Sequence, residues 1–432
     1  MSVNVQVSEP PLGPAMAISL VVGTMIGGGI FVLPASLAPL GWNAAVGWVI
    51  SGAGAMCLAV TLRFLMRDSG EGFHAVVERT LGPSVAFLAM WSFWTAGLVS
   101  IAALSVAAGA IASDLMFEQP PPGASVIASL AFLAIITGVN LAGTKSAGRA
   151  QVLTVVIKLV PLALAVVLIT AFTLRGEQTK PLAPVPITFA DTSKAVAMTL
   201  FALLGFEMVA VPAQKIRNPG RNIPVALIGG TGIVVAIYIT VSTGLVLMMP
   251  WQEIAASSAP VSDLLASELG ELWGKATAVC VLVAMVGCVN GLLFCQGDCA
   301  QSMAERGELP AAFARINARG VAHWGIISSF AGAAALILFS AARGSSGAFE
   351  FLILVTSGNC LVFYAVGVVA AARTNAVAWR WPTILGGLAF TALATYGVGL
   401  DSALWVWPLL ALGLVLRWAN QRSRFPRAHS VR

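Results

Sequence analysis

Long apolar runs recur from residue 14 to residue 419, and they constrain the fold more than any other feature of the sequence. A helix needs about 20 apolar residues to cross the hydrocarbon core of a bilayer. An open strand cannot cross it, because its backbone N–H and C=O groups would lack partners. We therefore predict an all-α integral membrane protein with about twelve transmembrane helices. The apolar runs cover residues 14–39, 42–66, 84–112, 124–143, 150–173, 190–213, 223–249, 273–302, 323–342, 348–372, 381–399 and 402–419.

The charged residues are too few for a large soluble domain. Only 10% of the 432 residues are charged, whereas soluble domains carry about 25%. The first apolar run lacks a basic n-region and a small-residue cleavage site, so we expect it to be retained as a helix. Membrane topology explains the net charge of +6, and we expect no nucleic-acid partner.

The six cysteines all fall within apolar runs, which argues against disulfides between loops. Cys288, Cys295 and Cys299 share one helical face, but no histidine lies near them in the sequence. Buried cysteine commonly behaves as a small hydrophobic residue, so we expect no metal and no cofactor. An enzyme would need clustered His, Cys, Asp or Glu at membrane depth, and the sequence shows only scattered ones.

Lysines and arginines divide unequally between alternate loops. If the N-terminus is cytoplasmic, 18 of them lie on the inner side and 5 on the outer side, with Lys158 inside a span. This imbalance is what the positive-inside rule expects. We therefore predict that both termini are cytoplasmic. Residues 250–275 form an acidic outer segment, in which we expect a short surface helix.

Glycines interrupt the first span. Gly23, Gly27, Gly28 and Gly29 fall within seven positions, and each glycine costs about 1 kcal/mol relative to alanine inside a helix. Broken backbone at membrane depth is tolerated only where protein covers it or where it lines a polar cavity. Residues 23–29 therefore form either a binding site or a close contact between helices through small residues.

A second interruption is predicted in the sixth span, at Gly205 and Glu207. Similar elements five helices apart run in opposite directions through the membrane. Interrupted spans at matching positions indicate an inverted-repeat transporter and its binding site. The predicted segments are a cytoplasmic tail (1–13), a first repeat of five helices (14–173), a second repeat of five (190–372), two further helices (381–419) and a basic cytoplasmic tail (420–432).

Lys158 and Glu207 lie inside predicted spans, where an ionisable residue costs at least about 2.5–3.5 kcal/mol. Glu207 either takes a proton during transport or caps the broken helix as a structural carboxylate. Three helical turns of apolar residues surround Lys158, and burial makes the protonation of a lysine responsive to its surroundings. Lys158 acts either as a proton-coupling or cation-replacing ammonium, which we favour, or as a static ion-pair partner.

Four motifs, in order, resemble the amino acid–polyamine–organocation superfamily of transporters, and the resemblance covers essentially the whole chain. Residues 23–34 resemble its unwound first helix, and residues 205–207 resemble its break in helix 6. Residues 215–224 and 305–310 resemble the loops after helices 6 and 8. The bacterial basic amino acid/polyamine antiporters, including the arginine/agmatine exchangers, are the most similar members. The resemblance implies a leucine-transporter-like fold with a 5+5 inverted repeat, discontinuous helices 1 and 6, and a location in the bacterial cell inner membrane.

The resemblance also implies a substrate site at the two breaks. The substrate carboxylate is expected to meet backbone N–H groups at the positive end of a half-helix, and its ammonium is expected to meet freed carbonyl groups. The expected substrate-binding residues are Thr24, Met25, Ile26, Gly27, Gly28, Gly29, Ala96, Gly97, Ile101, Leu104, Phe201, Ala202, Leu204, Gly205, Leu292, Thr356 and Ser357.

The sequence departs from the arginine/agmatine exchangers at several of these positions. Phe201 and Leu292 stand where those exchangers place tryptophans, and Ile101 replaces a polar residue. The expected pocket is therefore apolar and suits a neutral side chain. Lys158 resembles a lysine of proton-dependent permeases in the same superfamily. An ammonium and a sodium ion repel strongly at low dielectric, so Lys158 argues against sodium coupling.

These features predict a secondary active transporter that moves amino acids by alternating access, with proton coupling through Lys158 and Glu207 preferred. Exchange of an amino acid for a related amine and export of a neutral amino acid are the alternatives. From other classes, a channel is less consistent with one long chain, and a non-transporting membrane sensor stays open. The expected partners are an amino acid or amine substrate, protons and the lipid bilayer, with a homodimer left open.

Overall fold

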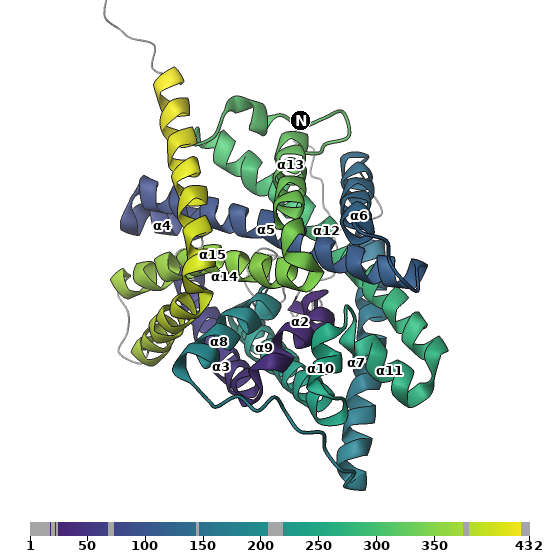
Figure 1. Ribbon diagram of the computed structural model, residues 1–432. Coiled ribbons are helices and arrows are strands. Elements are labelled where there is room, and N and C mark those ends of the chain that lie inside the picture. Colours follow the sequence, from purple (N-terminus) through teal and green to yellow (C-terminus); the bar gives the residue numbers. More distant parts are fainter. Residues whose placement is uncertain are drawn as a thin grey trace, which may run out of the picture.

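The computed structural model describes residues 18, 22, 25–67, 73–143, 147–205, 219–374 and 380–424. No strand occurs among these residues. The helices are α2 (Gly29–Leu37), α3 (Trp42–Arg67), α4 (Phe73–Leu81), α5 (Pro83–Met116), α6 (Ala124–Leu141), α7 (Ala147–Arg175), α8 (Phe189–Leu203), α9 (Pro219–Met248), α10 (Trp251–Ala256), α11 (Pro260–Leu269), α12 (Glu271–Glu305), α13 (His323–Ser340), α14 (Gly344–Arg373) and α15 (Trp381–Arg424), with the short 3-10 turns η1 (Ala38–Leu40), η4 (Ala311–Ala314) and η5 (Ala341–Arg343) (Figure 1).

Nine of the described helices are long and apolar enough to cross a membrane, which fits the predicted all-α integral membrane protein. Within α15, Gly399 has φ 73° and ψ 162°, so two helical segments meet there. A positive φ is accessible to glycine at little cost. This kink falls between the predicted spans 381–399 and 402–419. The count of about twelve spans and the 5+5 inverted repeat stay predictions.

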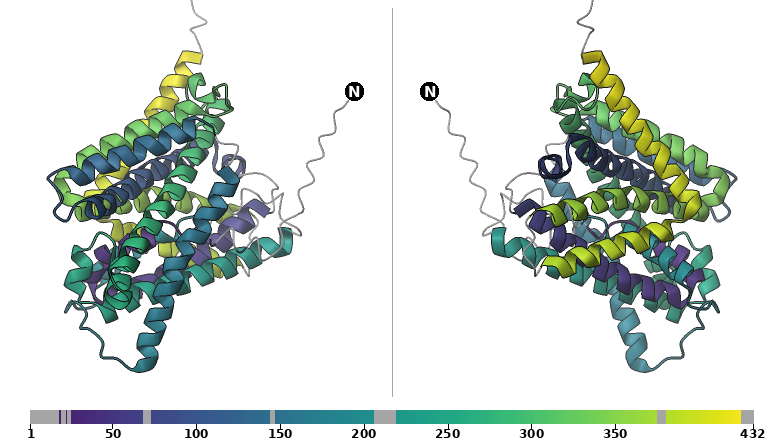
Figure 2. Two further views of the ribbon diagram at one scale, coloured as in Figure 1. Left: turned by 90° about the vertical axis from the view of Figure 1, so that its right-hand side faces the viewer. Right: turned by 90° about the vertical axis from the view of Figure 1, so that its left-hand side faces the viewer.

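Two helices, α5 and α14, form the centre of the bundle. The apolar middle of α5 and most of the apolar part of α14 are buried, and the two helices pack against each other. In contrast, α6, α7 and α15 lie on the outside and expose most of their apolar residues (Figure 2). In a chain that crosses a membrane, these outer faces are the ones that contact lipid.

Two parts of the fold differ from the apolar-run prediction in detail. The loop between the second and third spans contains the helix α4, which the apolar runs alone do not reveal. Its residues Val76 and Val77 are buried, and Glu78 forms an ion pair of 3.1 Å with Arg306. The acidic segment 250–275 forms two short helices, α10 and α11, where one surface helix was predicted, and then begins α12.

Candidate substrate cavity

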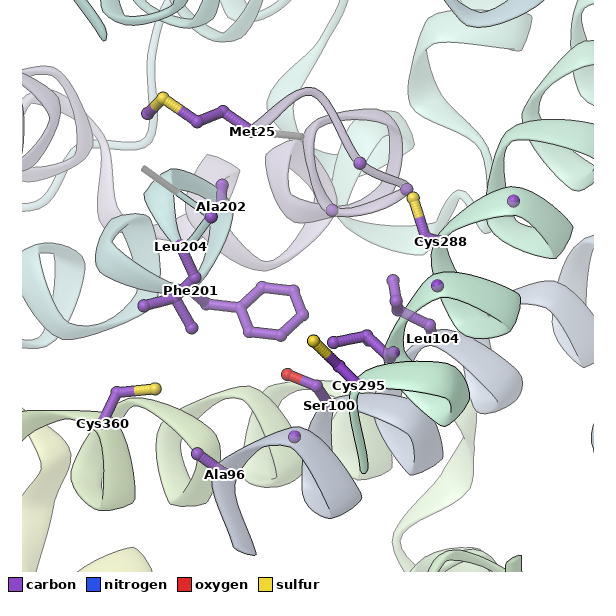
Figure 3. A pocket seen from close by; sticks show the side chains of 18 of the residues that line it. Met25, Ala96, Ser100, Leu104, Phe201, Ala202, Leu204, Cys288, Cys295 and Cys360 are labelled. Carbon is purple, nitrogen blue, oxygen red and sulfur yellow. The ribbon is translucent and has the colours of Figure 1, made fainter. Parts of the chain in front are cut away.

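A cavity of about 250 Å³ lies where α2, α5, α7, α8 and α12 approach one another. Its walls are mostly apolar, and the Phe201 ring points across it toward the helices that carry Ser100 and Cys295 (Figure 3). Glycines on α2 and at the end of α8 supply backbone to its surface. The cavity therefore lies beside both of the predicted helix breaks.

On one side of the cavity, the chain leaves helical structure before α2. The Ile26 N–H donates to the Val22 carbonyl at 2.9 Å, Ile26 and Gly27 are non-helical, and α2 begins at Gly29. The first N–H groups of a helix have no partner within the helix, and together they carry partial positive charge. The beginning of α2 is therefore suited to face a carboxylate.

On the other side, α8 ends at Leu203. Leu204 has extended backbone (φ −60°, ψ 144°), and Gly205 has a φ of 117°. A φ in this range is rarely adopted by residues with a Cβ. The last carbonyl groups of a helix lack donors from the helix interior, and at the end of α8 the Phe201 carbonyl accepts from the Leu204 N–H at 3.3 Å. Phe201, Ala202 and Leu204 at this helix end line the cavity.

Side-chain packing holds the glycines of α2 close to their neighbours. A Cβ atom on Gly28 would lie 2.7 Å from Met285 Cγ, and one on Gly29 would lie 3.1 Å from Phe201 Cε1. The sequence left open whether these glycines form a binding site or a close contact between helices. In the structure Gly28 and Gly29 do pack closely against neighbouring side chains, and they also line the cavity.

One carbonyl of the predicted ammonium site is already engaged. The Tyr238 hydroxyl donates a hydrogen bond of 2.9 Å to the Met25 carbonyl. A carbonyl oxygen has two lone pairs, so one remains for a ligand. Tyr238 is fully buried and was not among the predicted residues.

Lys158 also lines the cavity, where it is only 2% exposed and lies near Cys288. Of the described residues on the cavity surface, Lys158 alone carries a charge. The predicted coupling residue Glu207 and the predicted binding residue Thr24 lie outside the described residues.

Most of the predicted binding residues that the structure describes meet in this cavity. Those on its surface are Met25, Gly27, Gly28, Gly29, Ala96, Gly97, Leu104, Phe201, Ala202, Leu204, Gly205 and Leu292.

Four predicted residues lie off the cavity surface: Ile26, Ile101, Thr356 and Ser357. All four are buried. Ser357 donates its hydroxyl to the Ala197 carbonyl at 2.7 Å, and therefore links α14 to α8. The Thr356 hydroxyl has no hydrogen-bond partner among the described residues.

The sequence analysis did not assign a further set of lining residues: Phe93, Ser100, Gly287, Cys288, Gly291, Cys295, Gln296 and Cys360. The α12 members follow a helical spacing of three and four, which puts them on one face. The shared face of Cys288 and Cys295, noted in the sequence, was the available signal. Gln296 also fixes α12 to α5, because its amide donates to the Trp94 carbonyl at 2.6 Å and the Trp94 indole donates to the Gln296 carbonyl at 3.2 Å.

The bundle of apolar helices and the cavity at the beginning of α2 and the end of α8 define a multi-pass membrane protein with an internal cavity. The sequence profile described as amino acid permease matches residues 12–416, and the chain belongs to this family. The resemblance to the amino acid–polyamine–organocation superfamily is confirmed. The protein is therefore a transporter and not an enzyme.

Several characterised relatives cover most of the chain. The putrescine transporter PotE of Escherichia coli (strain K12) is 27% identical over 320 residues, which is 72% of each chain. The cadaverine/lysine antiporter of the same organism is 25% identical over 351 residues, covering 79% of this chain and 77% of the relative. The putrescine transporter PotE of Haemophilus influenzae is 25% identical over 367 residues, 84% of each chain.

Proposed function

We propose that this protein moves amino acids or related amines across the bacterial inner membrane by alternating access, with both termini in the cytoplasm. The observation that carries the proposal is the single cavity shared by the beginning of α2, the end of α8 and Lys158. Substrate binding shifts the populations of outward- and inward-facing states only if the two states bind it differently. A cavity built at two helix breaks can change shape between such states without unfolding whole helices.

The backbone of the cavity is suited to the polar groups common to all α-amino acids. The carboxylate faces the N–H groups at the beginning of α2, where the helix dipole favours negative charge. The ammonium faces the carbonyl groups at the end of α8 and the remaining lone pair of the Met25 carbonyl. Binding through backbone alone does not discriminate among amino-acid side chains.

Selectivity then rests on the side chains that form the walls. Phe201, Leu104 and Leu292 are apolar, and Lys158 is the one charge on the described part of the surface. A neutral or apolar substrate side chain gives up little hydration free energy when it enters a cavity with such walls. A charged substrate side chain without a partner would give up much more. We therefore propose a neutral amino acid as the preferred substrate of uptake.

Exchange of an amino acid for an amine is the second candidate, and the names of the relatives favour it. A cationic amine in the cavity would lie close to Lys158. Two like charges repel by several kcal/mol at about 4 Å, even at an effective dielectric constant near 20. Entry of the amine would therefore favour release of the Lys158 proton, so that cation and proton exchange across the membrane.

Uptake into liposomes tests both candidates. The purified protein is screened for thermal stabilisation by the amino acids and their decarboxylation amines, and uptake of the hits is then measured with and without a pH gradient. We predict that Lys158→Ala abolishes stimulation by the pH gradient, because the variant has no ammonium to protonate at this position. A sodium gradient should change uptake by neither the wild type nor Lys158→Ala.

Lys180→Ala is the matched control, because Lys180 is exposed and does not line the cavity. It should keep the response to the pH gradient. An unchanged response in Lys158→Ala would remove this residue from the coupling mechanism. Absence of flux for every compound in the wild type would refute the proposed transport and favour a sensor.

A further inference from the structure

A second cavity, of about 410 Å³, lies next to the substrate cavity and is far more polar. It is enclosed by α2, the end of α5, the beginning of α6, the loop after α10 and the beginning of α14. Six serines line it: Ser36, Ser113, Ser125, Ser257, Ser258 and Ser346. We call it the outer cavity, because the positive-inside distribution predicts that these segments face outward.

Ser113 presents a hydroxyl that lacks a protein partner. The residue lines the outer cavity and is only 2% exposed, and its Oγ forms no hydrogen bond with the described residues. An unmade hydrogen bond on a buried hydroxyl costs about 1–3 kcal/mol. A ligand that donates a hydrogen bond here would recover that free energy.

The charge of the outer cavity is negative. Asp114 is the one charged side chain among the described residues on its surface. Asp263 lies just behind, where it accepts a hydrogen bond from the lining residue Ser257. Asp263 is still exposed to solvent in part; partial desolvation raises the pKa of its carboxyl, the Ser257 hydrogen bond opposes the rise, and the charge of Asp114 adds to it. The two carboxylates are therefore close enough to repel each other.

Three of the cations that the sequence places on the outer side have other partners. The Arg343 guanidinium lies 4.2 Å from the centre of the Phe351 ring. Lys194 pairs with Glu350 at 2.6 Å, and Lys275 pairs with Glu271 at 2.6 Å. No ion pair joins Asp114 to a cation within the described part of the chain, so its charge is open to a ligand.

The outer cavity lies further along α2 and α5 than the substrate cavity, which we call the inner cavity from here on. Gly29 and Leu104 line the inner cavity, and Val32 and Ala107 line the outer one about a helical turn further along α2 and α5. Between the cavities, the Phe201 ring packs edge-to-face on Phe349 with centroids 6.1 Å apart. Phe349 itself lines the outer cavity.

We propose that the outer cavity is a separate binding site for the primary ammonium group of a cationic substrate, held between the Asp114 carboxylate and the surrounding serine hydroxyls before it passes Phe201 and Phe349. The proposal rests on the exchange candidate, in which a cationic amine is one of the two substrates. An ammonium offers three N–H donors, which match one carboxylate and the hydroxyl of Ser113. Two carboxylates near the entrance also raise the local concentration of cations.

Protection of an introduced thiol tests this site without measuring transport. Ser346→Cys places a thiol on the exposed lining of the outer cavity, and the purified full chain is labelled with an impermeant, positively charged thiosulfonate. The protein without the substitution gives the background from the native cysteines. Labelling is repeated with putrescine, cadaverine, leucine, and sodium chloride at matched ionic strength.

The diamines should slow labelling severalfold, whereas leucine and sodium chloride should not. Asp114→Asn in the same background should remove the protection. Asp401→Asn is the matched control, because Asp401 is an exposed carboxylate that does not line the outer cavity, and it should keep the protection. Equal protection by leucine or sodium, no protection by diamines, or protection that survives Asp114→Asn would each overturn the site. Flux measured in parallel liposomes reports separately on the proposed transport.

Discussion

At the scale of single residues, Asp263 ties the loop after α10 to α11. The Ser257 hydroxyl donates to its carboxylate, and the Ala259 N–H donates to the Ser257 Oγ at 3.0 Å. Burial raises the pKa of this carboxyl from its usual value of 3.8, and the charge of Asp114 adds to the rise against the opposing hydrogen bond. The Asp263 carboxyl therefore holds its proton more tightly in the folded protein than in the unfolded chain.

We predict that Asp263→Asn raises the Tm of the detergent-solubilised protein at about pH 8. Asparagine still accepts the Ser257 hydrogen bond but carries no charge. A carboxyl whose folded pKa is raised contributes stability below its unfolded pKa and loses that contribution as the pH rises through the folded pKa. The gain should therefore shrink as the pH is lowered toward 3.8, the usual pKa of this carboxyl. Thermal unfolding over this range measures it, and a gain that does not depend on pH would contradict the assignment.

The choice of residues on α5 shows where prediction from the sequence stops. The resemblance led to Ile101, but Ser100 and Leu104 line the cavity and Ile101 does not. Residues four apart share a helical face, whereas adjacent ones point about 100° apart. Because α5 is buried nearly all round, no polar side marks its orientation, and an error of one position moves a residue off the cavity.

At the scale of helices, missing side chains set how closely neighbours approach. Gly397 of α15 lies against the backbone of α8, where an added Cβ would be 1.8 Å from the Ser193 carbonyl oxygen. A backbone atom cannot rotate away as a side chain can. The contact between α15 and α8 therefore depends on glycine at position 397.

We predict that Gly397→Ala lowers the stability of the protein by about 1–3 kcal/mol or more, which is the usual cost of overpacking. Gly138→Ala on α6 is the control, because no atom lies within 4 Å of its added Cβ. Alanine there should be neutral or stabilising, since glycine costs about 0.5–1 kcal/mol in a helix interior. Thermal unfolding in one detergent compares them, and an equal Tm for both variants would show that α15 shifts freely.

The helices themselves were largely predictable, because apolar length is a strong requirement of the bilayer. The non-helical backbone before α2 and the end of α8 fall at glycines that the sequence singled out, near Gly27 and at Gly205. The helix α4 was not found, because it is short and amphipathic, with Val76 buried and Glu78 in an ion pair. A search for helical periodicity outside the apolar runs would have detected it.

At the scale of the whole molecule, two cavities lie in series and an aromatic pair separates them. The inner one carries Lys158, and the outer one carries Asp114. Phe201 and Phe349 meet between them with their rings at 89°. Opposite charges at successive positions on one route would draw a cation into the outer cavity, and its passage to the inner cavity would favour release of the Lys158 proton.

We predict that Phe349→Ala opens the passage between the cavities. In right-side-out vesicles, an impermeant thiol reagent should then label the inner-cavity cysteines Cys288, Cys295 and Cys360 severalfold faster. Phe351→Ala is the control, because Phe351 is also buried on α14 but packs against Trp405 and Phe339. It should label as the wild type does. Equal labelling of the two variants would mean that the route into the inner cavity avoids Phe349.

The position of Phe201 has a consequence for how this transporter can diverge. The ring lines the inner cavity, lies close to Gly29 and packs edge-to-face against Phe349. A smaller residue at 201 would enlarge the space for cargo and also loosen the barrier, while a larger one would do the reverse. Substrate affinity and turnover therefore both depend on this side chain. A substitution at 201 that changes the preferred substrate would need a compensating substitution on α14 to keep the barrier between the two cavities.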